Sequence, residues 1–161
     1  MHSAAAMNGS NIGRREFCAH AISFAAAGSL LASCGGSPTS SSGGQSLPAL
    51  PIVNGVTAGG AVTVSVDSGS PLATVGNAVL VQSNAGQFLV ARTAQDSFTA
   101  LTAVCTHQGC TVSNYQSGTY GCPCHGSEYS TSGAVRNGPA TQPLRQFQTQ
   151  FANNVLTISV A

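Results

Sequence analysis

The stretch of sequence that decides the fold lies between residues 105 and 129. It contains two motifs rich in cysteine and histidine, Cys105-Thr-His-Gln-Gly-Cys110 and Cys122-Pro-Cys-His-Gly-Ser-Glu-Tyr129. Two thiolates and two imidazoles from these motifs form a ligand set that suits a zinc ion or an iron–sulfur cluster. The surrounding residues 104–144 show little periodicity and contain many Gly and Pro residues, as is typical of a functional loop region. We therefore expect a metal centre here.

Zinc and iron–sulfur chemistry would use the cysteines of these motifs differently. A Cys2His2 zinc site needs only four ligands and would leave Cys110 and Cys124 without a role. In an oxidising compartment, a surplus pair of cysteines forms a disulfide. A disulfide that closes a loop of this size stabilises the folded state by about 3 kcal/mol in the chain-entropy model. The residues thus predict a metal site whose two loops are cross-linked by a disulfide. Zinc remains the alternative metal.

The two motifs resemble those of Rieske [2Fe-2S] proteins, in particular the high-potential kind found in cytochrome bc complexes. The resemblance implies one cluster whose two irons have different ligands. It assigns these ligands in pairs, with Cys105 and Cys122 on one iron and His107 and His125 on the other. It further implies that Cys110 and Cys124 form the disulfide of the family.

Residues beyond the ligands extend the resemblance. It implies that Ser127 donates its hydroxyl to a bridging sulfide and that Tyr129 donates its own to the sulfur of Cys105. Gly138-Pro-Ala140 resembles the proline loop that covers the cluster in the family. The likeness is strong over about residues 98–143 and rests on architecture alone in the flanking strands.

Two positions depart from the respiratory pattern. His107 and Cys122 are separated by 14 residues, slightly fewer than usual, so we expect a short loop over residues 114–121. Gln108 stands where those proteins commonly place Leu, which shields the cluster and helps docking onto cytochrome b. Both departures leave the expected cluster chemistry intact, although they weaken the assignment of the partner.

The mixed ligand set predicts a high reduction potential. Two ferric ions, two sulfides and two thiolates sum to zero charge, whereas four thiolates would leave an oxidised site that repels a further electron. Rieske centres accordingly lie at about −150 to +300 mV, against about −400 mV for plant-type ferredoxins. Hydrogen bonds from Ser127 and Tyr129 would raise the value further, so we expect a positive midpoint potential near neutral pH. The resemblance also implies that His125 is the catalytic contact with quinol, at the exposed tip.

The remainder of the domain predicts an all-β protein. Val62, Val64 and Val66 alternate with polar residues, which indicates a half-buried strand, and Asn153-Asn154 indicates a hairpin turn. Strands are expected over residues 61–67, 78–82, 87–93, 98–104, 144–151 and 155–160. With the resemblance, these predict a Rieske-type antiparallel β-sandwich over residues 51–161, with a small cluster-binding subdomain of loops and short strands over about residues 103–142.

Charge argues against two classes of partner. The 161 residues include no Lys, and five Arg nearly cancel four acidic residues. A basic patch for nucleic acid is therefore disfavoured, and a polybasic membrane anchor is excluded.

The N-terminal residues 1–33 are expected to form an export signal. Arg14-Arg15 precede an uncharged apolar run, and the segment from Asn11 to Phe17 resembles the twin-arginine motif. The run ends in Leu31-Ala-Ser-Cys34, which resembles a bacterial lipobox, so Cys34 is the expected lipidation site. An uncleaved N-terminal helix is the alternative anchor. Residues 34–50 are rich in Gly and Ser and are expected to be a flexible linker. Either anchor would hold the domain on the extracytoplasmic side of a membrane.

These expectations favour electron transfer from quinol or a dehydrogenase to a c-type cytochrome, with cytochrome b as a further partner. Two alternatives stay open: the small Rieske subunit of a molybdenum oxidase such as arsenite oxidase, and a stand-alone lipoprotein that senses redox state. A Rieske oxygenase is disfavoured, because no further His in the expected domain is available for a mononuclear iron site.

Overall fold

The computed structural model describes residues 47–161. The expected twin-arginine signal, the lipidation site at Cys34 and the linker up to residue 46 lie outside the described residues. Within residues 47–161, no helix is long and apolar enough to cross a membrane. The single turn of 3-10 helix at Pro71–Ala73 is the only helix in this range.

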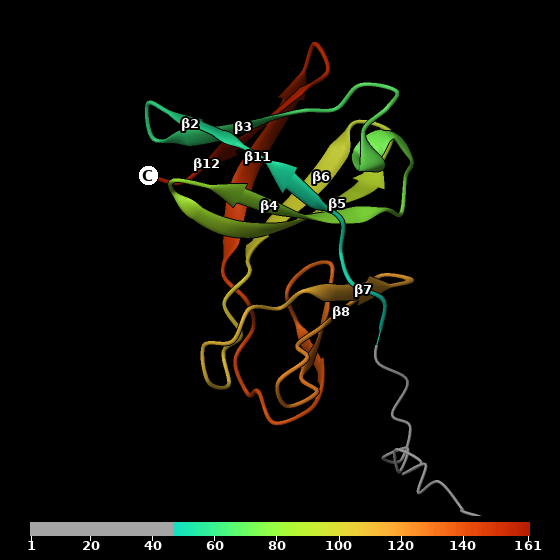
Figure 1. Cartoon of the computed structure of the whole chain (residues 1–161), viewed down its shortest axis with the longest axis vertical. Helices are drawn as coiled ribbons and strands as arrows, with labels where there is room; N and C mark the ends of the chain where they lie inside the picture. The colour runs from blue at the N-terminus through green and yellow to red at the C-terminus, as the bar shows by residue number, and fades with distance from the viewer. Residues whose placement is uncertain (1–46) are drawn as a thin grey trace, which may run out of the picture. The chain divides into compact units, whose positions relative to one another are not determined.

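The larger of two sheets has eight strands in the order β1-β4-β5-β6-β11-β12-β3-β2 (Figure 1). In chain order its strands are β1 (Ile52–Asn54), β2 (Val56–Ala58), β3 (Ala61–Ser65), β4 (Ala78–Ser83), β5 (Gly86–Ala94), β6 (Ser97–Thr102), β11 (Gln146–Ala152) and β12 (Val155–Ser159). All six expected strands are present. The pairs are antiparallel apart from β1 with β4, which is parallel. The predicted all-β fold is thus confirmed, with this one parallel pair as an addition.

The sheet closes on itself at Gly55. Its two outer strands, β1 and β2, follow each other in the chain with only this residue between them. A Cβ atom at position 55 would lie 2.5 Å from Val62 Cγ1 and 3.0 Å from Val81 Cγ1, so the crossing requires glycine. The amide of Gly55 donates to the carbonyl of Gln82 over 2.8 Å and so continues the pairing with β4. One extended segment therefore joins both ends of the sheet.

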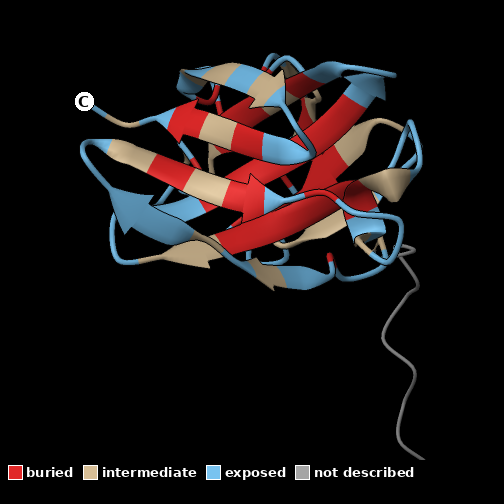
Figure 2. Ribbon diagram, turned by 90° about the horizontal axis from the view of Figure 1, so that it is seen from above, coloured by how far each residue is buried: buried red, intermediate tan, exposed pale blue. Residues whose placement is uncertain are grey.

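Aliphatic side chains from both halves of the closed sheet fill its interior. Buried residues alternate with more exposed ones along β3 and β12 (Figure 2), as expected for strands with one face toward the core. The buried interior residues include Val62, Val64, Val79, Val81, Val90, Leu156 and Ile158. β4, β5 and β6 are buried on both faces. Their other face contributes Leu80, Leu89 and Leu101 to a second core beneath the cysteine motifs.

The smaller sheet contains four antiparallel strands in the order β10-β9-β8-β7. These strands are β7 (Asn114–Gln116), β8 (Thr119–Gly121), β9 (Glu128–Ser130) and β10 (Val135–Asn137). The expected short loop over residues 114–121 is a hairpin. Ser117 and Gly118 form its turn with φ values of 48° and 81°, as a two-residue hairpin loop requires. The Asn153-Asn154 turn is confirmed in the same way, with φ values of 51° and 59°.

Residues 47–50 cover the outer edge of β7, and we call this segment the strap. The amide of Tyr115 donates to the carbonyl of residue 48 over 2.8 Å, and the amide of Leu50 donates to the carbonyl of Ser113 over 2.7 Å. The side chain of Leu50 is 7% exposed and joins the core beneath the cysteine motifs. We expected these residues to end the flexible linker. They belong to the folded domain instead, because their backbone is paired and their apolar side chain is buried.

Candidate metal centre

The two cysteine motifs fold into loops with the same hydrogen-bond pattern. In the first, the amide of Cys105 donates to the carbonyl of Cys110 over 2.8 Å, and the amide of Gly109 donates back to the carbonyl of Cys105 over 2.9 Å. In the second, the amide of Cys122 donates to Ser127 over 2.8 Å, and that of Gly126 donates to Cys122 over 3.0 Å. Both glycines have positive φ, 76° and 73°, which a side chain would disfavour. The spacing within each motif thus sets its loop geometry.

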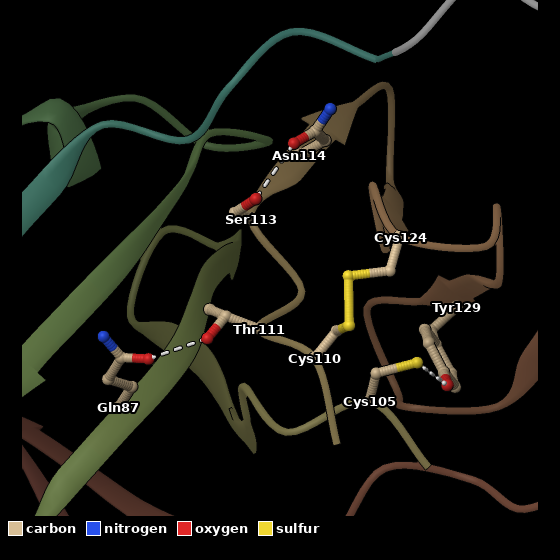
Figure 3. Close-up of a disulfide and its surroundings, with 8 residues drawn as sticks. All are labelled: Gln87, Cys105, Cys110, Thr111, Ser113, Asn114, Cys124 and Tyr129. Carbon is tan, nitrogen blue, oxygen red and sulfur yellow. Dashed lines mark hydrogen bonds between the residues drawn. A yellow bond between two sulfur atoms is a disulfide. The ribbon is translucent and has the colours of Figure 1, made fainter. Parts of the chain in front are cut away.

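A disulfide between Cys110 and Cys124 joins these two loops (Figure 3). Their Cα atoms lie 6.5 Å apart, and 14 positions separate them in the sequence. The predicted pairing is therefore confirmed. The sulfur of Cys122 lies within 4.8 Å of both disulfide sulfurs, so the cross-link is next to an expected metal ligand. Because the bonded pair offers no thiolate, Cys105 and Cys122 are the free thiols of the described domain.

Both free thiols are buried, with 3% and 2% of Cys105 and Cys122 exposed. Burial raises the pKa of Cys105, but hydrogen bonds, chiefly from the Tyr129 hydroxyl and then from the His107 amide, more than offset this, and the net pKa is lowered. Burial raises the pKa of Cys122, and the neighbouring Cys105 raises it further. The surroundings of Cys105 thus favour the thiolate, which is the form that binds metal.

The two histidines lie together at the outer side of the motifs. Their ring centroids are 4.9 Å apart with the planes at 85°, and His125 is exposed whereas His107 is half-buried. The Nδ1 atom of His107 is buried and finds no hydrogen-bond partner among residues 47–161. A buried nitrogen without a partner is unfavourable, and a bond to a metal would satisfy it. Two thiols, two imidazoles and this unpartnered nitrogen fit a metal group with mixed sulfur and nitrogen ligands.

The loop over residues 138–140 packs directly on the second motif. The buried Ser127 hydroxyl accepts a hydrogen bond from the amide of Ala140 over 3.2 Å, and its own proton stays available for donation. Gly138 has a φ of 94°, and a Cβ there would lie 2.5 Å from the Cα of Ser127. Only glycine permits this approach, which holds the expected proline loop against the site.

Tyr129 and Thr106 share contacts beside Cys105. The Tyr129 hydroxyl lies 3.2 Å from the Cys105 sulfur, as its expected role requires, and the tyrosine is fully buried. The hydroxyl of Thr106 is 3.0 Å from the same oxygen and donates to the carbonyl of Gln142 over 2.7 Å. Thr106 was not among the residues expected at the site. Its place between two expected ligands was the one signal that could have identified it.

Comparison with known proteins gives a consistent assignment. The sequence model of the Rieske [2Fe-2S] domain matches residues 63–148, more than half of the chain. Over 66 residues, the chain is 36% identical to the cytochrome b6-f complex iron-sulfur subunit of Chlorobaculum tepidum, covering 40% of this chain and 36% of that protein. Over 64 residues, it is 41% identical to the ubiquinol-cytochrome c reductase iron-sulfur subunit of Rhodobacter capsulatus, covering 38% of this chain and 28% of that protein. These matches span about a third of the length of the curated relatives.

A solved structure agrees with the sequence matches. The crystal structure of the plasma membrane Rieske protein PetC3 from Synechocystis PCC 6803 aligns with a TM-score of 0.50 and 31% identity. The alignment covers 59% of this chain and 97% of that one. The match over residues 63–148 includes both cysteine motifs, the disulfide and the loop that packs on them. This chain therefore belongs to the Rieske [2Fe-2S] domain family.

Proposed function

We propose that this chain is an electron-transfer protein, or the iron–sulfur subunit of an oxidoreductase complex. The family holds one [2Fe-2S] cluster, and the proposal assigns its ligands by residue. Cys105 and Cys122 would bind one iron, and His107 and His125 would bind the other. The observation that carries the assignment is the separation of the motif cysteines into one disulfide pair and two buried free thiols, beside the unpartnered Nδ1 of His107.

The residues around the site would favour a high potential and hold the two ligand loops together. When bound, the cluster supplies reversible one-electron chemistry. The hydroxyls of Ser127 and Tyr129 are placed to donate hydrogen bonds toward the site, which stabilises added negative charge. The disulfide joins the two loops that carry the proposed ligands, and the loop over residues 138–140 packs on the second of them. Among the four proposed ligands, only His125 is exposed, so it would be the point of contact with an electron donor or acceptor.

The proposed partners are a quinol or dehydrogenase as donor and a c-type cytochrome as acceptor, at the extracytoplasmic face of a membrane. Relatives that are subunits of cytochrome b6-f and ubiquinol-cytochrome c reductase complexes support this choice. The twin-arginine-like and lipobox-like segments support the location. Anchoring through Cys34 or through an uncleaved helix is part of the same proposal.

Absorption and EPR spectra of the purified protein test the cluster and its ligands. We expect the spectrum of a [2Fe-2S] centre with mixed ligands and a positive midpoint potential at neutral pH. Cys105→Ser should abolish the signal. Gln108→Ala is a matched control, because Gln108 lies in the same loop and is exposed, and it should leave the signal unchanged. A colourless protein that contains one zinc, or a midpoint below about −100 mV, would contradict the proposal.

Purification from native membranes tests the partners. Cytochrome b and a c-type haem in the same fraction would support the proposed complex. Molybdopterin in their place would assign the chain to a molybdenum oxidase instead. A chain recovered with neither, and with an intact cluster, would favour the stand-alone redox sensor.

A further inference from the structure

The hydroxyl of Tyr129 has more hydrogen-bond neighbours than its single proton can serve. Its oxygen lies 3.2 Å from the Cys105 sulfur and 3.0 Å from the Thr106 hydroxyl. The amide of Thr106 also donates to it over 3.2 Å. That amide can only donate, so it occupies a lone pair of the tyrosine oxygen and leaves the tyrosine proton for one of the other two neighbours.

The bond between Thr106 and Gln142 fixes the direction of the contact with Tyr129. The Gln142 carbonyl, 2.7 Å from the threonine hydroxyl, can only accept, so that contact uses the one proton of Thr106. While it is made, a hydrogen bond between Thr106 and Tyr129 needs the proton of the tyrosine. The threonine oxygen therefore competes with the Cys105 sulfur for the same donor.

We infer that Thr106 is a positioning residue that lowers the reduction potential of the site by drawing the Tyr129 proton away from Cys105. The inference rests on the proposed function, in which Cys105 is a cluster ligand. A hydrogen bond to that sulfur stabilises the reduced state, because the ligand then carries more negative charge. Whenever the Tyr129 proton is donated to Thr106, the hydrogen bond to the Cys105 sulfur is lost and the reduced state is less stable. Thr106 thus opposes the increase in reduction potential that Tyr129 provides.

Redox titration of the full-length protein carrying Thr106→Val tests the inference. Valine keeps the shape of threonine and removes the competing oxygen. We expect the equilibrium constant for reduction to rise about fivefold, since a net neutral hydrogen bond is redirected. Thr106→Ser keeps the hydroxyl, so its equilibrium constant for reduction should equal that of the wild-type protein. An unchanged or lower constant in Thr106→Val would overturn the inference.

A double-mutant cycle with Tyr129→Phe separates this effect from a looser loop at Gln142. Without the tyrosine proton, Thr106→Val should leave the reduction constant unchanged. An equal rise in both backgrounds would show that Thr106 acts through Gln142, and it would overturn the inference. Thr106→Ala is the second variant, and loss of the cluster from both Thr106→Val and Thr106→Ala would also count against it. A wild-type protein without a [2Fe-2S] signal would instead refute the proposed function.

Discussion

At the scale of single residues, the buried hydroxyl of Tyr120 lowers the stability of the folded state. The side chain is fully buried, and its hydroxyl has no hydrogen-bond partner in the described part of the chain. Burial raises its pKa well above the ordinary value, and the neighbouring Tyr115 adds to the shift. Tyr115 carries a similar ring, 4.9 Å away, but its hydroxyl donates to the carbonyl of Gly76 over 2.9 Å. The two tyrosines therefore form a matched pair for testing.

We predict that Tyr120→Phe leaves the free energy of unfolding unchanged at neutral pH or raises it by about 1 kcal/mol, because an unsatisfied buried group is removed. Tyr115→Phe should lower it by up to about 1 kcal/mol. The raised pKa means that the native state keeps a proton that the unfolded state releases, so wild-type stability falls as the pH rises above about 10. Tyr120→Phe should reduce this alkaline loss. Denaturant titrations at pH 7 and above pH 10 measure both effects, and a neutral-pH loss above about 2 kcal/mol would contradict the prediction.

Gly138 and Gly118 offer a second matched pair, because both have positive φ. A Cβ at Gly118 would meet nothing within 4 Å, whereas at Gly138 it would overlap Ser127 and the carbonyl of Gly126. We predict that Gly118→Ala costs about 1–2 kcal/mol from its backbone conformation alone. Gly138→Ala should cost a further 1–3 kcal/mol, on the order of an overpacked core site. Faster amide exchange at Ala140 should accompany only the second change, and equal effects would rule out the overlap.

At the scale of elements, the strap stabilises the smaller sheet through one buried side chain. We predict that Leu50→Ala lowers the free energy of unfolding by about 2–4 kcal/mol, since Leu50 is 7% exposed. Ile52→Ala, two residues further on, removes a side chain that is 60% exposed and should cost about 0.5 kcal/mol or less. Chemical denaturation measures both variants. The amide of Tyr115 should exchange faster only in Leu50→Ala, and unchanged exchange there would contradict a stabilising strap.

Six strands could be predicted because each is long enough to show alternation or an aliphatic run. β1, β2 and the four strands of the smaller sheet are three residues each, too short for any periodicity. The disulfide between Cys110 and Cys124 could be predicted because both short motifs resemble those of a known family. The strap and the role of Thr106 could not, because both depend on distant partners. The bond from Thr106 to Gln142 spans 36 positions.

At the scale of the whole molecule, the described domain is electrically balanced. Residues 47–161 contain three arginines and three acidic residues. One of the arginines, Arg92, is only 7% exposed and donates to the carbonyls of Leu72 and Ala73. The surface therefore carries little charge with which to steer a partner over a distance.

We predict that the rate constant for electron transfer to the proposed acceptor cytochrome changes by less than about twofold between low and physiological ionic strength. Stopped-flow kinetics at several salt concentrations measures this dependence. An acceptor with a strongly basic surface is the control. Its rate constant should also depend little on salt, because this domain has few acidic residues to attract it. A tenfold fall in rate with added salt would show that charges outside the described residues direct the encounter.

The pairing of β3 with β12 has a consequence for biosynthesis. Ala61 lies opposite Ser159, so a strand near the start of the domain completes its hydrogen bonds only with one near its end. A ribosome delivers these strands in order, and the interior stays open to solvent until β12 leaves the exit tunnel. A nascent domain of this topology can therefore complete its fold only after β12 has emerged from the ribosome, and chaperones would meet an exposed valine-rich surface in the meantime.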